Sequence, residues 1–271
     1  MRRIGTREAA AAVAGAGLEF FTPDDLAQAL GIPRQRAMDI AARMADVNLA
    51  RRVKRGLYAL LPPAEWGNPA GFAVDWHTTA AQLMADTPYF LGYYTAMSLH
   101  QMIQHPLRTV FVATTERRRN RRIGPVTFRF ITLTRRRFFG FDRLTPQGGT
   151  QVQVAHLERT FVDCVDRPRL CGGLDEIVSG YRRRLGDLNR DRLLAHVQRL
   201  DDVAATRRLG FLLELVGYRY TTLLWDLEEF AANRGDYVPL TPGQLPGGPR
   251  NRRWRLDLPP NIRRLADRPV T

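Results

Sequence analysis

The chain has 271 residues, of which 44% are hydrophobic, and this length is comfortable for two domains with real cores. No apolar run approaches the roughly 20 residues that a membrane span needs. Two cysteines, Cys164 and Cys171, exclude a disulfide or zinc framework and make a reducing, cytoplasmic location the default expectation. The formal net charge is +14, and Lys54 is the only lysine, so nearly all of the basic charge is arginine. Such a basic protein favours a polyanion or an acidic protein as its partner.

The first twenty residues, "MRRIGTREAAAAVAGAGLEF", place arginines before an alanine run, as a signal peptide does. The run is weakly apolar, however, and Glu8 and Glu19 bracket it. We therefore expect a first amphipathic helix here, not an export signal.

The next segment, "FTPDDLAQAL", carries the signals of a helix start. Thr22 can cap the helix, Pro23 suits the first helical position, and Asp25 stands where a capping box requires an acid. Gly31 can supply a left-handed cap at the end, and a second helix is predicted to begin at Pro33.

This second helix, "PRQRAMDIAARM", has one apolar face and one polar face. The apolar side chains recur at helical spacing and are Ala37, Ile40, Ala41 and Met44. Two helices joined by a three-residue corner, with forked polar side chains at the start of the second, form the anatomy of a helix-turn-helix. The predicted DNA-reading side chains are Arg34, Gln35, Arg36, Asp39 and Arg43.

Arginine and glutamine suit a major groove because each can make two parallel hydrogen bonds to a base edge. The carboxylate of Asp39 would be repelled by DNA phosphates. It either accepts from a cytosine amine or orients Arg36 or Arg43 at i±3/4 spacing.

The following "LARRVKRGLYALLP" contains two short apolar runs around a possible tight turn at Gly56. It is predicted to be a β-hairpin wing whose basic side chains reach phosphates or the minor groove. These side chains are Arg51, Arg52, Lys54 and Arg55.

A segment rich in proline and glycine, "LPPAEWGNPAG", marks a domain boundary. The predicted architecture is α+β: a winged helix-turn-helix over residues 1–62, a linker over 63–75, and a larger mixed α/β domain over 76–271. Two helices are expected within residues 74–102. His100 is expected to be a core or capping histidine. Alternation of β-branched and aromatic residues predicts three strands, at 109–115, 126–133 and 150–156.

Residues 108–143 hold eleven arginines against two acidic residues, Glu116 and Asp142. Two arginine runs lie between the predicted strands, interleaved with phenylalanines. They are either solvated loops or a binding surface for nucleic acid or an acidic protein face. The residues of this possible partner-binding patch are Arg117, Arg118, Arg119, Arg121, Arg122, Arg135, Arg136 and Arg137.

Residues 157–217 are predicted to form three or more amphipathic helices, and a short final strand is expected around Trp254–Leu258. The histidines are scattered, and none is paired at metal-ligand spacing. A catalytic role for Asp163, Asp166 and Arg167 lacks a second convergent group, so a structural role is favoured. No Walker loop, GxSxG, HExxH or CxxC pair is present. We expect no catalytic residues, metal or cofactor.

An ordered set of motifs resembles the AbiEi-type antitoxins of bacterial abortive-infection (AbiE, type IV) toxin–antitoxin systems. The motifs run in family order across roughly residues 20–258. They are the Gly31–Pro33 corner, "RGLYAL", "GYYTAMSLH", "RRRFFGF", "ERTFVDCVDRP" with "GGLDEIV", "RRLGFLLELVG" and "NRRWRLDL".

The resemblance implies an N-terminal winged helix that binds inverted repeats in its own promoter and represses the operon. It also implies a larger C-terminal α/β domain that neutralises a nucleotidyltransferase-like toxin. Residues 34–43 match the DNA-reading helix of the family, and residues 51–55 match its wing.

Two other functions stay open on the sequence alone. One is a winged-helix transcriptional regulator whose C-terminal domain senses a small ligand. The other is a nucleic-acid-modifying enzyme with a winged-helix targeting domain. A toxin-like reading frame next to the gene would favour the antitoxin, and its absence would favour the ligand-sensing regulator.

Overall fold

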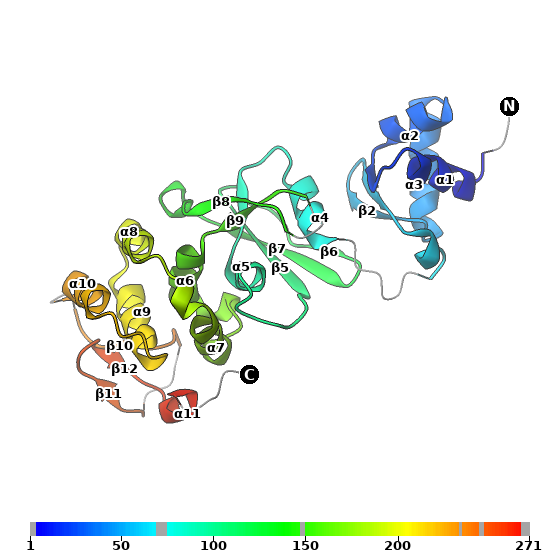
Figure 1. Ribbon diagram of the computed structural model, residues 1–271. Coiled ribbons are helices and arrows are strands. Elements are labelled where there is room, and N and C mark those ends of the chain that lie inside the picture. Colours follow the sequence, from blue (N-terminus) through cyan, green and yellow to red (C-terminus); the bar gives the residue numbers. More distant parts are fainter. Residues whose placement is uncertain (1–3, 69–74, 147–149, 233–234, 244–246, 267–271) are drawn as a thin grey trace. The chain divides into compact units, whose positions relative to one another are not determined.

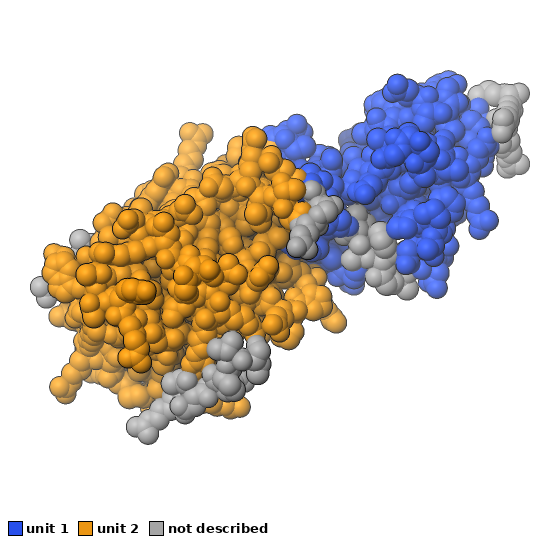
Figure 2. All heavy atoms as spheres, in the orientation of Figure 1, with its two compact units in different colours: residues 1–86, 119–129, 147–150 blue, residues 87–118, 130–146, 151–271 orange. Residues whose placement is uncertain are grey.

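The computed structural model describes residues 4–68, 75–146, 150–232, 235–243 and 247–266 (Figure 1). The chain forms two compact units, coloured separately in Figure 2. Unit 1 consists of residues 1–86, 119–129 and 147–150, and unit 2 consists of residues 87–118, 130–146 and 151–271.

The first part of unit 1 is a winged helix-turn-helix, as predicted. Its helices are α1 (Thr6–Gly15), α2 (Pro23–Leu30) and α3 (Arg34–Asp46). Its antiparallel sheet has the order β1-β3-β2, with β1 at Phe20–Phe21, β2 at Ala50–Lys54 and β3 at Leu57–Leu60. A short 3-10 helix, η1 (Pro63–Glu65), follows the sheet.

Apolar side chains from all three helices and the sheet meet in one core. Phe21, Leu26, Ile40 and Met44 are completely buried in it. Each large side chain removed from water in this way stabilises the fold by roughly 1.5–3 kcal/mol. The two wing strands reverse at Gly56, whose φ of 72° is a left-handed conformation that glycine adopts without a steric penalty.

A six-stranded sheet follows in the order β6-β7-β5-β4-β9-β8. Strand β4 pairs antiparallel to β5 and parallel to β9. The strands are β4 (Tyr89–Leu91), β5 (Thr109–Thr114), β6 (Arg121–Ile123), β7 (Val126–Thr132), β8 (Phe141–Leu144) and β9 (Val152–Ala155). The three strands expected from alternation are present as β5, β7 and β9.

The two helices predicted within residues 74–102 are present, but a strand that was not predicted lies between them. The segment forms α4 (Trp76–Leu83), then β4, then α5 (Tyr93–Leu99). Strand β4 is three residues long, too short to show alternation, and it is defined by pairing with both neighbours. The first arginine run also contributes strand β6, and the second forms the 3-10 helix η2 (Arg135–Arg137), so neither run is a plain loop.

Helices cover the sheet and continue away from it in layers. Helix α5 packs on β5 and on α6, and α6 in turn packs on α8 and α9 (Figure 1). The helices are α6 (Leu157–Asp166), α7 (Leu174–Arg184), α8 (Arg190–Leu200), α9 (Val203–Leu215), α10 (Thr221–Ala231) and α11 (Ile262–Ala266). The 3-10 turns η3 (Pro168–Leu170) and η4 (Leu185–Asp187) connect some of them.

A small sheet of order β10-β12-β11 completes unit 2. Its strands are β10 (Val238–Pro239), β11 (Arg250–Asn251) and β12 (Leu256–Asp257). The expected final strand is therefore present, although Trp254 lies in the turn before it and is 1% exposed.

Candidate nucleic-acid interface

The corner between α2 and α3 is fixed by local hydrogen bonds. The Thr22 hydroxyl accepts from the Asp25 backbone N–H at 3.2 Å, and the Asp25 carboxylate accepts from the Thr22 N–H at 2.7 Å. This is the predicted capping box. Gly31 ends α2 at a φ of 61°, and Ile32 donates back to the Ala27 carbonyl at 3.1 Å. The orientation at which α3 begins is therefore set by the chain itself.

Helix α3 has the predicted two faces. Ala37, Ile40, Ala41 and Met44 are buried, whereas Arg34, Gln35, Asp39 and Arg43 are exposed. Arg36 is partly buried on the flank. Pro33 occupies the N-cap, one residue before the helix proper.

Two of the arginines on α3 have partners on the protein surface. Arg34 Nε donates to the Asp24 carboxylate at 2.7 Å, with both side chains more than 60% exposed. Arg43 Nε donates to the backbone carbonyl of Asp39 at 3.3 Å, so Asp39 holds Arg43 through its main chain. An exposed ion pair contributes at most about 1 kcal/mol. Arg34 can therefore exchange Asp24 for another partner at little cost.

The four basic residues of the wing do not all face solvent. Arg52 and Arg55 are exposed. Lys54 Nζ donates to the Gln82 carbonyl at 2.8 Å, and Arg51 is half-buried against Gly124. Arg52 and Arg55 are therefore the wing side chains best placed for phosphates.

The five arginines of residues 117–122 are all exposed, and three of them donate hydrogen bonds within the chain. Arg118 Nη2 donates to the Thr87 hydroxyl, and Arg121 Nη1 donates to the Val53 carbonyl at 2.6 Å. Arg122 Nε donates to the Gly124 carbonyl at 3.3 Å.

Arg117 and Arg119 are exposed. Among the described residues, neither side chain has a hydrogen bond or ion pair with another residue. These two are therefore the arginines of the first run with the greatest freedom to bind a partner.

The second run is more tightly integrated. Arg137 lies 2.8 Å from the Asp166 carboxylate and 3.4 Å from that of Asp202, and so ties η2 to α6 and to the start of α9. Arg136 lies 3.8 Å from Asp201. Arg135 is exposed. Asp166 is thus paired with Arg137.

Charged groups inside unit 2 form a network that sequence reasoning missed. Arg159 donates to Asp163 at 2.9 Å, and both side chains are 1% exposed. The guanidinium also lies 4.2 Å from the centre of the Phe139 ring. Burial raises the pKa of the Asp163 carboxyl, while Arg159 opposes that rise. The i,i+4 spacing of this pair in "ERTFVD" was the available signal.

Two histidines far apart in the sequence also meet, a contact that sequence spacing does not reveal. His156 Nδ1 and His196 Nε2 lie 3.0 Å apart, so one ring donates to the other. Burial, together with the charges of His156 and the nearby arginines, lowers the pKa of His196 to about 4. His100 caps α5 and contacts the Ala155 carbonyl at 2.7 Å, as a packed histidine should.

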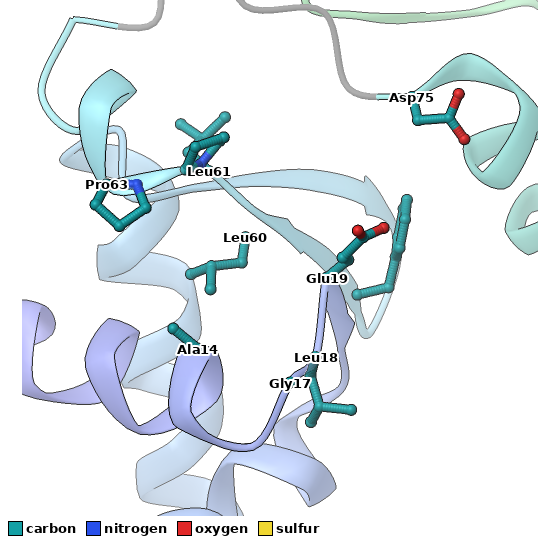
Figure 3. A pocket seen from close by; sticks show the side chains of 10 residues that line it. Ala14, Gly17, Leu18, Glu19, Leu60, Leu61, Pro63 and Asp75 are labelled. Carbon is teal, nitrogen blue, oxygen red and sulfur yellow. The ribbon is translucent and has the colours of Figure 1, made fainter. Parts of the chain in front are cut away.

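Unit 1 contains a pocket of about 510 Å³ between the α1–β1 turn and the end of β3 (Figure 3). Leu18, Leu60 and Pro63 give it apolar walls, and Glu19 and Asp75 add carboxylates. Asp75 also caps α4. Burial raises its pKa, but hydrogen bonds from His77 and Thr78 outweigh this and hold the pKa well below its usual range.

Family models match most of the chain. Residues 8–61 match the model described as "Transcriptional regulator, AbiEi antitoxin", and residues 90–215 match "AbiEi antitoxin C-terminal domain". The chain belongs to the AbiEi antitoxin family. The first match spans the winged helix, and the second spans the sheet and the helices through α9. In this AbiEi chain, α3 and the wing therefore lie in the part that the family describes as a transcriptional regulator.

The fold of this AbiEi chain has also been seen in a solved structure. The crystal structure of the RV2827C protein from Mycobacterium tuberculosis superposes with a TM-score of 0.68. The two sequences are 16% identical, and the match covers 98% of this chain and 97% of that chain. No curated protein matches the AbiEi chain.

Neither a metal site nor a membrane span is found in the described parts of this AbiEi chain. Within the described ranges, no three or more His, Cys, Asp or Glu side chains are grouped as metal ligands would be. The longest helices described have 13 residues, and none of the described helices has the length and apolarity that a bilayer crossing requires.

Proposed function

We propose that this AbiEi protein represses its own operon by binding an inverted repeat in the promoter with α3 and the wing. The observation that carries the proposal is the set of exposed forked side chains on the first turns of α3, opposite its buried face. Side chains at the start of such a helix are the ones that reach base edges in the major groove. The proposal assigns this role to residues 1–62, joined by a linker at 63–75 to the domain at 76–271.

Within this interface, Arg34 and Gln35 read bases, Arg36, Asp39 and Arg43 support them, and Arg52 and Arg55 bind phosphates. Arg51 and Lys54 have partners within unit 1 and are the less available members of the wing. A transcriptional regulator acts on promoter DNA, so the proposed location is the cytoplasm. The family match supports DNA as the first partner.

The experiment is fluorescence anisotropy with a duplex from the region upstream of the gene and with a shuffled duplex of equal length. The wild-type protein should prefer the upstream duplex by a factor on the order of 10³ or more. Equal affinity for the two duplexes would refute promoter recognition.

We further propose that the domain at 76–271 neutralises a nucleotidyltransferase-like toxin and that Arg117 and Arg119 contact it. Both are exposed, and their charge suits an acidic protein face. The test is a paired assay of promoter repression and rescue from the toxin with Arg117→Ser/Arg119→Ser. Lost rescue with intact repression is expected. Intact rescue would remove these arginines from the toxin interface.

The matched control is Arg122→Ser, since Arg122 is also exposed but donates to the Gly124 carbonyl of its own turn. Arg118 and Arg121 are left unchanged in this design. Their side chains bind Thr87 and Val53, so replacing them would disturb the local backbone as well as the surface charge.

The ligand-sensing regulator remains the second candidate function. The pocket of about 510 Å³ lies in unit 1, which differs from the C-terminal location that this alternative requires. The neighbouring reading frame discriminates between the two functions: a nucleotidyltransferase-like toxin beside the gene supports the antitoxin, and its absence supports the sensor.

A further inference from the structure

Two sequence motifs that DNA reading does not use meet at one pocket of unit 2. "RRLGFLLELVG" forms most of α9, and "NRRWRLDL" forms the turn between β11 and β12. The pocket has a volume of about 240 Å³ and is lined by Arg207 of α9, Glu228 and Ala231 of α10, and residues 252–255 of the turn. Residues beyond 215 lie outside both family models, so the comparisons assign no role to this turn.

The turn is held rigidly against α9. Trp254 Nε1 donates to the Glu214 carboxylate at 2.6 Å, and the Trp254 backbone N–H donates to the Asn251 side chain at 2.8 Å. The indole ring packs so closely on Gly210 that an added Cβ would lie 2.2 Å from it. The arginines on either side of Trp254 are therefore placed on a fixed support.

One of these arginines occupies an unfavourable backbone conformation. Arg255 has a φ of 48°, in the left-handed region that glycine and asparagine adopt more readily. Glycine would complete this turn with less strain. Non-glycine residues in such conformations cluster at functional sites. Because the backbone conformation does not favour arginine, we look to the guanidinium for the reason that arginine occupies position 255.

Two guanidiniums converge on one carbonyl. Arg255 Nη1 donates to the Gly235 oxygen at 3.2 Å, and Arg207 Nη2 donates to the same oxygen at 3.4 Å. Arg207 is 2% exposed and also donates to the Asp236 carbonyl at 2.6 Å. Burial lowers the pKa of Arg207, the charge of Arg255 lowers it further, and Asp236 opposes both.

The carboxylates at this pocket are largely engaged by a third arginine. Arg253 contacts Glu214 and lies 2.9 Å from Glu228, and Glu214 also accepts from Trp254. Arg252, the fourth arginine of the lining, is exposed. Four arginines and one glutamate, Glu228, line the pocket, so its lining carries an excess of positive charge.

We propose that this pocket binds a compact phosphate group, either free pyrophosphate or the phosphate tail of a nucleotide. Guanidinium forks match phosphate oxygens in pairs. The volume is below the roughly 300–1,000 Å³ of sites that enclose a drug-sized ligand, so the pocket suits a small anion. Its one lining ring, Trp254, is buried, so it offers no exposed aromatic face on which a base could stack.

The test is isothermal titration calorimetry of the full-length protein with pyrophosphate and, separately, with ATP, at constant ionic strength. Arg255→Gly removes the guanidinium and relieves the backbone, so the protein should keep its melting temperature and bind both ligands roughly tenfold to a hundredfold more weakly. Arg252→Gln should also weaken the binding of both ligands. Arg250→Gln is the matched control, since Arg250 lies on the same hairpin but is paired with Asp257.

We expect the wild-type protein to bind pyrophosphate and ATP with affinities that differ by no more than a few fold. We expect the same of Arg250→Gln. No saturable binding by the wild type, or equal binding by Arg255→Gly and Arg250→Gln, would overturn the proposal. So would tight ATP binding that survives Arg255→Gly, because the Arg255 guanidinium would then not hold the phosphate. The site does not depend on promoter recognition, and Arg255→Gly should leave DNA affinity unchanged.

Discussion

Helix α3 of unit 1 and the α6–α9 layer of unit 2 use arginine in opposite ways. Arg34 and Arg43 stand on the surface of α3, where they have weak local partners. Arg159 of α6 and Arg207 and Arg208 of α9 are at least 92% buried and donate to groups of their own unit. The net charge of +14 therefore overstates the charge available to a partner. Exposure and internal hydrogen bonds separate the two uses.

The largest difference between the two regions should appear in stability. Arg159→Ala leaves the Asp163 carboxylate buried without its ion-pair partner and should lower the free energy of unfolding by about 3–5 kcal/mol. Arg43→Ala, on the surface of α3, should change it by less than about 0.5 kcal/mol. Urea denaturation of both variants measures this. Similar urea midpoints for the two variants would show that buried and surface arginines do not differ in their contribution to stability.

Adding a methyl group to the packed α9 layer should destabilise the protein nearly as much as removing the Arg159 guanidinium. Gly210→Ala places a methyl group 2.2 Å from the Trp254 ring and should cost up to about 3 kcal/mol. Gly186→Ala, where no atom lies within 4 Å, is the matched control and should be close to neutral. Thermal unfolding compares the two. A Gly210→Ala protein as stable as the control would show that Trp254 can move away from α9.

The buried layer should also make stability depend on pH. Since the pKa of His196 is lowered to about 4 in the folded state, the unfolded chain binds more protons below its own pKa of about 6.5. Stability is then present at neutral pH and falls as the pH drops through this window, by roughly 2 kcal/mol between pH 7 and 5. Urea midpoints across that range provide the measurement.

His196→Gln should flatten most of this slope, while His105→Gln, an exposed histidine, should leave it unchanged. A slope that survives His196→Gln would assign the pH dependence to another group. His100 would be the next candidate, because burial lowers its pKa as well.

Substitutions in the wing should have the smallest effect, and that effect should be on DNA affinity and not on stability. Arg52→Ala/Arg55→Ala should reduce the slope of log affinity against log salt by about 0.9 for each phosphate that the wing no longer neutralises. The same change should weaken upstream and shuffled duplexes alike. Lys54→Ala is expected to change the slope less, because Lys54 Nζ is bound to the Gln82 carbonyl. An unaltered slope for the double variant would exclude the wing from the interface.

The sequence allowed correct prediction where local signals decide the structure. The Thr22–Asp25 capping box, the Gly31 cap and the buried face of α3 all depend on residues within one or two turns of each other. The family motifs allowed the architecture to be assigned across the chain, and the family models confirm that assignment.

What could not be predicted depends on residues far apart in the chain. Strand β4 is defined by its neighbours in the sheet, and the His156–His196 pair joins residues 40 positions apart. The bonds of Arg121 to Val53 and of Lys54 to Gln82 likewise have no local signature. The arginines of a charge run that have internal hydrogen bonds therefore could not be told from those that have none by the sequence alone.

The central claim is that α3 reads base sequence, and one pair of variants tests it most directly. Gln35→Ala should cost on the order of 1–3 kcal/mol of binding free energy on the upstream duplex and little on a shuffled duplex, because only the cognate site presents the base edge that the amide recognises. Arg7→Ala, on the exposed face of α1, should affect neither duplex appreciably. If Gln35→Ala weakened both duplexes equally, base reading by α3 would be contradicted.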